Sequence, residues 1–508
     1  MDFGTPSERD FVGNAPPPPV QTALARPLYV DLDGTLCVTD TLHESLVLMV
    51  RTQPWLLLLA FFWLFKGKAY FKREVAKRCM PEAGTLPYHP EFMAWLQAQQ
   101  TGGRPLILAT AADEAIAQSV FRHVGLFDAL IASNTGEQAG ENRVGALKLQ
   151  ALQAHVQARY GTPDFAYAGN STSDLAVWAC AQEAIAVNTP AQVLRQLQNT
   201  HPNALVFEGP ATGWRTWRKA LRLQQWAKNI LLFIPAVAAH QWAPHVWSAL
   251  GLAFLAFGLC ASATYLLNDL FDIPNDRKHK TKRHRPLASG SLSVAAAVPM
   301  LGTLLLVAFA LAASYSWALM AVLACYTATT VAYSFKFKRT AVLDVLLLAS
   351  LYTMRLIAGA VTANVQPSNW LLAISMFLFL SLALVKRCSE LEEVIHLDDT
   401  ETARGRGYHQ DDLPSLRSMG IGSGFLAVLV LALYIDSQNG QAQYPQVGWL
   451  WGVAPIMLWW VMRIWLKTGR RELQGEDPLQ FALHDRFSWW TLAAMAVLAF
   501  MATRRWGF

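Results

Sequence analysis

Residues 31–35 (DLDGT) carry two aspartates two positions apart, directly after an apolar stretch that begins at Pro27. A short apolar run that ends in turn residues predicts a buried strand, so both carboxylates would stand at its carboxyl end. A carboxylate at Asp31 can attack phosphorus and form an aspartyl-phosphate, and Asp33 can protonate the leaving oxygen. The pair therefore predicts phosphoryl-transfer chemistry.

Two further predicted strands, 105–109 and 165–168, also end in polar residues. The first runs into Thr110 and the second into GNSTSD (169–174). Helical patterns separate these strands, which predicts a parallel α/β sheet whose ligand site lies at the carboxyl ends of the strands. Thr110 can hold an oxygen of a transferred phosphoryl group. Oxygen donors suit Mg²⁺, and the candidate ligands are Asp31, Asp33 and Asp174.

These segments resemble, in order, the four motifs of the haloacid dehalogenase-like (HAD-like) superfamily, over residues 26–210. The resemblance implies a Rossmann-like parallel sheet with a helical cap, phosphatase activity and a need for Mg²⁺. Lys148 matches the third motif, which implies that it holds the transferred phosphoryl oxygens together with Thr110. One position departs from the pattern. The fourth motif usually has an acid after its glycine, whereas this chain has Asn170. An amide oxygen can still coordinate a metal, but the site loses one negative charge, so the sequence leaves the activity of this domain open.

A cap-sized insertion, about residues 36–100, separates the first two motifs. It contains an apolar run, 55–65, that is too short to cross a bilayer. Basic residues follow the run: Lys66, Lys68, Lys72 and Arg73. Two interpretations stay open. The run is either the buried face of a helical cap or a surface that lies on the membrane and admits a lipid substrate.

The rest of the chain has the composition of a membrane protein. The whole sequence is 53% hydrophobic and 15% charged, against about 25% charged residues in soluble domains. Residues 215–508 predict an all-α bundle of nine transmembrane helices. Their approximate limits are 226–243, 246–267, 294–315, 317–333, 341–361, 370–385, 419–435, 447–464 and 487–501. The basic loops alternate so that the N-terminus would be cytoplasmic. The Pro-rich residues 1–25 predict a disordered leader. The net charge of +6 is modest and its basic residues cluster between apolar runs, so nucleic-acid binding is the weaker interpretation.

A second candidate site follows the second predicted span. Asn268, Asp272 and Asp276 are spaced four apart, so one helix would present all three on one face, although Pro274 can bend or end that helix. Acids at a membrane helix end are costly unless they bind a cation. We predict Mg²⁺ at Asn268, Asp272 and Asp276, with Asp269, Asp272 and Asp276 as the catalytic acids. The cations that follow can bind phosphate, and they are Lys280, Lys282, Arg283 and Arg285.

This stretch, NDLFDIPNDRKHKTKRHRPLASG (268–290), resembles the first aspartate-rich motif of the UbiA prenyltransferase superfamily. Residues 225–229 (QWAKN) and 477–486 resemble the branch that transfers phosphoribose to polyprenyl phosphate. The second aspartate-rich motif of the aromatic prenyltransferases is not intact here. The resemblance implies further substrate-binding residues, which are Lys228, Asn229, Tyr333, Lys336, Lys338, Lys386 and Arg387. Asp344 and Arg355, inside one predicted span, either face the cavity or pair with each other.

Three functions remain open from the sequence. The first is a Mg²⁺-dependent transferase that moves 5-phosphoribose from phosphoribosyl diphosphate to a polyprenyl phosphate, with a HAD-like domain that dephosphorylates the lipid product. The second is a prenyltransferase that joins a prenyl diphosphate to an aromatic or other acceptor, with an ancillary HAD-like domain. The third is a transporter or scaffold. We expect a multi-pass protein of the cell membrane with both active sites on the cytoplasmic side. The sequence does not decide whether it forms a homo-oligomer.

Overall fold

The computed structural model describes residues 26–134, 142–397, 407–473 and 478–503. The predicted leader and Asp477 lie outside the described residues. The chain forms two compact units. The first contains the residues up to Ala220 together with Asp269–Val298, and the second contains Leu221–Asn268 and Pro299 onward. Each unit is described by itself.

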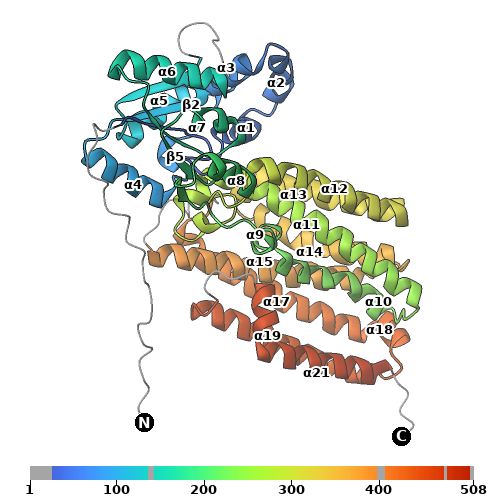
Figure 1. Ribbon diagram of the computed structural model, residues 1–508. Coiled ribbons are helices and arrows are strands. Elements are labelled where there is room, and N and C mark those ends of the chain that lie inside the picture. The colour runs from blue at the N-terminus through green and yellow to red at the C-terminus, as the bar shows by residue number, and fades with distance from the viewer. Residues whose placement is uncertain (1–25, 135–141, 398–406, 474–477, 504–508) are drawn as a thin grey trace, which may run out of the picture. The chain divides into compact units, whose positions relative to one another are not determined.

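A six-stranded parallel sheet forms the centre of the first unit (Figure 1). Its strand order is β3-β2-β1-β4-β5-β6. The strands are β1 (Leu28–Val30), β2 (Leu106–Asp113), β3 (Ala129–Ser133), β4 (Ala166–Gly169), β5 (Glu183–Val187) and β6 (Leu205–Phe207). The order reverses direction between β1 and β4, and ligands of open α/β sheets bind at such a switch point. The predicted α/β class is confirmed, although β3, β5 and β6 were not foreseen.

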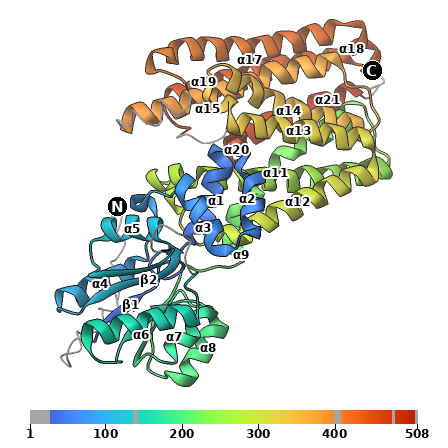
Figure 2. The ribbon, with the colours of Figure 1, turned by 90° about the horizontal axis from the view of Figure 1, so that it is seen from above.

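Helices cover both faces of this sheet, which is why its strands are apolar throughout. Leu28 and Val30 face α4 (Pro90–Thr101) and α5 (Glu114–Val124) in one core. Tyr29, between them, points to the other core, which α6 (Ala146–Tyr160), α7 (Leu175–Trp178) and α8 (Ala191–Thr200) share. Figure 2 shows these two helical layers. The alternation of successive strand residues thus divides the core into two halves.

Three helices between β1 and α4 form a cap with a core of its own. They are α1 (Thr41–Thr52), α2 (Leu56–Phe65) and α3 (Lys68–Arg78). Met49, Trp63 and Val75, one from each helix, are buried together in that core. Asp40 begins α1 because its side chain accepts a hydrogen bond from the His43 N–H, as a helix N-cap does.

Eight helices have the length and composition to cross a membrane, among the residues that the structure describes. These candidate spans are Pro244–Lys278, Val294–Tyr315, Trp317–Phe335, Leu343–Thr362, Asn369–Glu392, Gln410–Asp436, Val447–Gly469 and Arg486–Thr503. Two helices are shared between the units: α11 (Pro244–Lys278) belongs to the second unit up to Asn268, and α12 (Val294–Tyr315) belongs to it from Pro299. The other main helices of the second unit are α13 (Trp317–Phe335), α14 (Leu343–Thr362), α15 (Asn369–Leu397), α17 (Leu413–Asp436), α19 (Val453–Gly469) and α21 (Arg486–Thr503). The shorter ones are α10 (Ile234–Ala238), α18 (Gln438–Gln443) and α20 (Pro478–His484). The predicted helical membrane bundle is confirmed.

The first of the nine predicted spans, 226–243, does not form a long helix. A 3₁₀ stretch, Leu223–Phe233, leads into the five-residue helix α10 instead. Proline removes a helical N–H and clashes with the preceding turn, so a helix begins rather than continues at Pro235. Close packing also holds this stretch in place, since a Cβ added at Gly359 of α14 would lie 2.0 Å from the Leu232 carbonyl oxygen. The chain therefore runs against α14 here, at a distance that only glycine permits.

Candidate active sites

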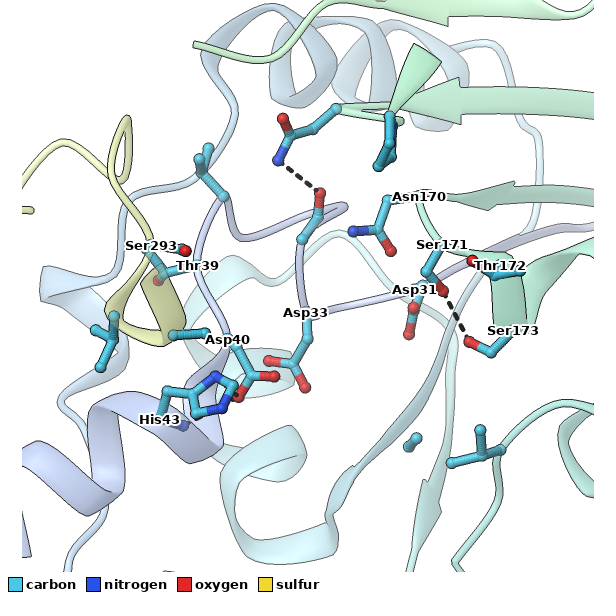
Figure 3. A pocket seen from close by; sticks show the side chains of 18 of the residues that line it. Asp31, Asp33, Thr39, Asp40, His43, Asn170, Ser171, Thr172, Ser173 and Ser293 are labelled. Atoms are coloured by element: carbon cyan, nitrogen blue, oxygen red, sulfur yellow. Dashed lines mark hydrogen bonds and ion pairs between the residues drawn. The ribbon is translucent and has the colours of Figure 1, made fainter. Parts of the chain in front are cut away.

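The predicted phosphoryl-transfer residues gather in a cavity of about 540 Å³ at the carboxyl ends of β1 and β4. Asp31 and Asp33 follow β1, and Asn170 follows the neighbouring strand β4 (Figure 3). The turn at Gly34 has a φ of +77°, and a Cβ there would lie 1.9 Å from the Asn170 amide nitrogen. Glycine is therefore required twice, for the backbone conformation and for the close approach of Asn170.

Asp31 is buried and its carboxylate lies 3.0 Å from the Lys148 ammonium. Burial raises the pKa of Asp31, while the charge of Lys148 opposes that rise. One oxygen of Asp33 accepts a hydrogen bond of 2.8 Å from the Thr41 N–H. Burial and then the negative charge of Asp40 raise the pKa of Asp33. The ammonium next to Asp31 favours its ionised form, and Asp33 more readily keeps its proton. Two carboxyl groups with different environments can take the roles of nucleophile and acid.

Asp174 holds Lys148 in place. Its Oδ1 accepts from Tyr167 Oη at 2.6 Å and lies 3.4 Å from Lys148 Nζ, and the same ammonium donates to Tyr167 Oη at 2.9 Å. The other carboxylate oxygen accepts from the backbone N–H groups of Asn170 and Ser171 and from the Ser171 hydroxyl. Although burial opposes it, Lys148 and these hydrogen bonds hold the pKa of Asp174 below its usual range. Asp174 therefore fixes both the lysine and the loop 170–174.

The donor chemistry of this cavity fits a divalent cation. Asp31 and Asp33 are oxygen donors, and their raised pKa values show that the charged forms lack full compensation. Mg²⁺ would supply that positive charge. No three His, Cys, Asp or Glu side chains among the described residues are arranged to hold a metal ion. The predicted ligand set, Asp31 with Asp33 and Asp174, therefore stays a prediction.

Thr110 lies on β2 and is buried, and its hydroxyl accepts a hydrogen bond of 3.0 Å from the Ala112 N–H. Its neighbour Ala111, not Thr110 itself, lines the cavity. The predicted role of Thr110 in holding phosphoryl oxygens stays a prediction.

The cavity has other polar walls that the sequence did not assign to it. Lys72 of α3 lines it and donates to the Ala111 carbonyl at 2.8 Å and to Asn142 Oδ1 at 2.9 Å. Asp40 and His43 contribute from the start of α1, and Figure 3 shows them beside Asp33. Lys72 was visible only as part of a basic run. Nothing in the sequence indicated that Lys72 faces the same cavity as the DLDGT segment, which lies far from it along the chain.

Ser293, Val294 and Ala295 also line this cavity, although they lie within the stretch Asp269–Val298 of the first unit. A buried ion pair holds that stretch to the cap. The Arg277 guanidinium donates to both carboxylate oxygens of Glu44, at 2.8 and 2.6 Å, and to the Ala288 carbonyl at 2.9 Å. Both side chains are less than a tenth exposed. The structure thus binds the stretch 268–290, through Arg277, to helix α1.

The aspartate-rich motif itself lies on α11. This helix continues through Pro274 to Lys278, so the proline does not end it. Asp269 and Asp276, seven residues and two turns apart, both contact the guanidinium of Arg285, at 3.2 and 2.7 Å. Asn268 and Asp272 lie on the same helix. Of the predicted phosphate-binding cations, Lys280 and Arg283 are exposed and Lys282 is half-buried. Arg285 therefore neutralises two acids. The other three cations lie in the loop between the end of α11 and Arg285.

The remaining predicted residues lie in the second unit. Lys228 lies over the Tyr352 ring, 5.4 Å from its centroid. Asn229 is fully buried, and its side-chain oxygen Oδ1 accepts a hydrogen bond of 3.0 Å from Arg355 Nε. Tyr333 is on α13, Lys336 and Lys338 are in the turn after it, and Lys386 is on α15. Their roles in substrate binding stay predictions.

The pairing of Asp344 with Arg355, one of the two predicted alternatives, is wrong. Asp344 pairs instead with Arg387 of α15 and accepts from the Tyr408 hydroxyl. Arg355 donates to Asn229 and, at 2.7 Å, to Tyr326 Oη. Charges inside a membrane bundle need partners, but here each partner comes from another element. Arg387, predicted to bind substrate, is 1% exposed and also contacts Glu390.

Comparison with known proteins finds a matching family for both parts of the chain. The sequence pattern of the UbiA prenyltransferase family matches residues 230–491, just over half of the 508 residues. That of the haloacid dehalogenase-like hydrolases matches residues 28–178. The chain therefore belongs to the UbiA prenyltransferase family and has a HAD-like domain at its N-terminal end.

Three relatives give the extent of the similarity. The uncharacterized protein y4nM of Sinorhizobium fredii is 35% identical over 484 residues, 94% of this chain and 91% of y4nM. The nodulation protein NoeC of Azorhizobium caulinodans is 34% identical over 271 residues, 53% of this chain and 87% of NoeC. The decaprenyl-phosphate phosphoribosyltransferase of Mycolicibacterium smegmatis is 37% identical over 180 residues, 34% of this chain and 56% of that enzyme.

The buried pair of Glu44 and Arg277 predicts a loss of stability when it is broken. Glu44→Ala leaves the guanidinium buried without its carboxylate, which costs about 3–5 kcal/mol. The exposed pair of Glu82 and Lys278, at 2.9 Å, joins the same two regions. Glu82→Ala is the matched control and should cost about 1 kcal/mol or less. Thermal unfolding of the two variants in detergent measures the difference. Equal melting temperatures would contradict the role given to Arg277.

The raised pKa of Asp31 predicts pH-dependent Mg²⁺ binding. Burial raises this pKa to about 6, so protons compete with the metal as pH falls through that value, and binding weakens. Calorimetric Mg²⁺ titration, in an Asp272→Ala background that disables the second candidate site, measures the affinity. We expect it to fall by about tenfold for each pH unit below the pKa. Adding Asp31→Asn should remove the part of this dependence that Asp31 contributes and leave the part that belongs to Asp33. An unchanged wild-type affinity from about pH 7.5 to about pH 5.5 would contradict the prediction.

Proposed function

We propose that the chain transfers 5-phosphoribose from phosphoribosyl diphosphate to a polyprenyl phosphate. The observation that carries the proposal is the acidic face of α11, with Asp269, Asp272 and Asp276, followed at once by a cationic loop. Similarity to the decaprenyl-phosphate phosphoribosyltransferase supports it over a third of the chain. Loss of a diphosphate from the anomeric carbon leaves an oxocarbenium-like sugar, which the lipid phosphate oxygen can attack.

The residues of the motif and of the loop after it have different roles in this proposal. Asn268, Asp272 and Asp276 are the candidates to hold Mg²⁺, which when bound supplies charge to the departing diphosphate. Arg285 bridges Asp269 and Asp276 and so orients the acids rather than binding phosphate. Lys280, Lys282 and Arg283 are the candidates to hold the 5-phosphate of the donor. In the balanced reaction, the anomeric C–O bond to diphosphate breaks, a C–O bond to the lipid phosphate forms, and diphosphate leaves.

The HAD-like domain, in the same proposal, removes the 5-phosphate of the lipid product. Asp31 attacks phosphorus while Lys148 keeps it ionised and binds a phosphoryl oxygen. Asp33 protonates the leaving 5-oxygen, and water then hydrolyses the aspartyl-phosphate and releases inorganic phosphate. Both sites face the cytoplasm in this proposal, as the basic loops favour.

A prenyltransferase that uses a prenyl diphosphate is the second candidate, because the family as a whole carries that description. The donor substrate discriminates between the two. The cationic loop favours a substrate pair that carries more phosphate than a prenyl diphosphate with an aromatic acceptor.

The transferase proposal predicts that the purified protein, with Mg²⁺ and polyprenyl phosphate, moves label from ribose-labelled phosphoribosyl diphosphate into extractable lipid. Asp272→Ala should lower this rate by about 100-fold or more, because the diphosphate then leaves without its metal. Asp436→Ala, which changes an acid outside the motif at the end of α17, is the control and should keep the rate. If no label enters the lipid but a prenyl diphosphate is consumed with an aromatic acceptor, the second candidate is correct.

The phosphatase proposal predicts that Asp31→Asn still makes labelled lipid but stops at the 5-phosphorylated form. The amide cannot attack phosphorus, while the α11 motif is unchanged. Thin-layer separation before and after treatment with an external phosphatase identifies the product. Wild-type protein that accumulates the same phosphorylated lipid would contradict a phosphatase role for this domain.

A further inference from the structure

Helix α2 of the cap is apolar at all ten positions, LLLLAFFWLF, yet most of it is exposed. Leu56, Ala60 and Trp63 are buried, and their spacing of four and three places them on one face, against the cap core. The outward positions carry Leu and Phe where a soluble helix would carry charges. Leu58 is 74% exposed, Phe62 is 63% and Phe65 is 76%. Trp55, just before the helix, is also exposed.

The charges around this helix have one sign. Residues 53–73 contain no Asp or Glu, whereas Lys66, Lys68, Lys72 and Arg73 all follow the helix. Lys66 and Lys68 are exposed directly at its end. A large apolar surface with aromatic rings, bordered by cations, is what binds the boundary between the headgroups and acyl chains of an anionic bilayer. A protein partner would not require this cationic border.

The length of α2 and the membrane helices elsewhere in the chain narrow further what the exposed face of α2 can bind. Ten helical residues extend about 15 Å, half of the roughly 30 Å hydrocarbon core, so α2 can dip into a bilayer but not cross it. The same chain carries eight candidate membrane spans among its described residues, so a bilayer is always near this domain. We propose that α2 inserts into the surface of an anionic membrane through Leu58, Phe62 and Phe65.

This inference deepens the proposed phosphatase function and rests on it for its consequence. The helix after α2, α3, supplies Lys72 to the cavity, and α1 supplies Asp40 and His43. The three helices share one core, so insertion of α2 would hold the cavity at the headgroup level. The substrate class is then a phosphomonoester on a lipid-linked sugar, not a soluble sugar phosphate.

Fluorescent labelling of the full chain in phosphatidylcholine–phosphatidylglycerol vesicles tests the insertion. Phe62→Cys carries an environment-sensitive dye, and Ala94→Cys, an exposed position on α4, is the control. The exposed cysteines, Cys180 and Cys325, are replaced by serine in both. We expect lipid-borne quenchers to act on position 62 several-fold more strongly than on position 94. Quenching by aqueous iodide alone, or protection from both quenchers by a covering protein surface, would overturn the proposal.

A second variant connects insertion to turnover. Leu58→Ser with Phe62→Ser changes only outward side chains, so the cap core is kept. We expect it to hydrolyse p-nitrophenyl phosphate as wild type does, and to hydrolyse the vesicle-borne phosphoribosyl lipid about tenfold more slowly. An equal loss of activity toward both substrates, or no loss toward either, would overturn the proposed substrate class. If wild type hydrolyses neither substrate while position 62 is still quenched from the lipid, the phosphatase proposal fails and the membrane insertion stands.

Discussion

A charge removed from water needs a partner, and this constraint arranges both units of the protein. In the first unit, the Lys148 ammonium lies between the carboxylates of Asp31 and Asp174, all three buried. Asp174 in turn orders the loop after β4 through Ser171 and Asn170. If the lysine were neutral, two buried carboxylates would repel each other at the carboxyl ends of neighbouring strands. The same cation that stabilises this arrangement keeps the attacking carboxylate ionised, so the fold and the proposed chemistry depend on one interaction.

The second unit meets the constraint in the same way. Arg387 and Asp344 are buried between α15 and α14, and Arg355 is satisfied by Asn229 and Tyr326. In the first unit, at the end of α11, Arg285 likewise neutralises Asp269 and Asp276. Each arrangement links elements that are distant in sequence, and breaking one partner leaves an uncompensated charge. Such pairs therefore act as positional constraints on the helices that bear them.

The sequence predicted the parts of this structure that depend on local pattern. Asp31, Asp33, Lys148 and Asn170 were expected at one edge of a parallel sheet, and the structure brings all four into one cavity. Strands β3, β5 and β6 were missed, because short apolar runs such as 205–207 cannot be distinguished from loop or helix segments by periodicity. The span at 226–243 was wrong because hydropathy does not register Pro235 or the close packing against Gly359. The pairing of Asp344 with Arg355 failed because helix rotation and neighbours decide partners. No local signal could have placed Lys72 or Ser293 at the cavity of the HAD-like domain.

The central claim is that one chain performs two successive reactions on one lipid, and a dual-label experiment tests it most directly. Phosphoribosyl diphosphate carrying ¹⁴C in the ribose and ³²P at the 5-position is given to the wild-type protein with Mg²⁺ and polyprenyl phosphate. The account predicts that ¹⁴C enters the lipid while ³²P appears as inorganic phosphate. Lipid that keeps both labels in their starting ratio would contradict the phosphatase step, and lipid that acquires neither label would contradict the transfer itself.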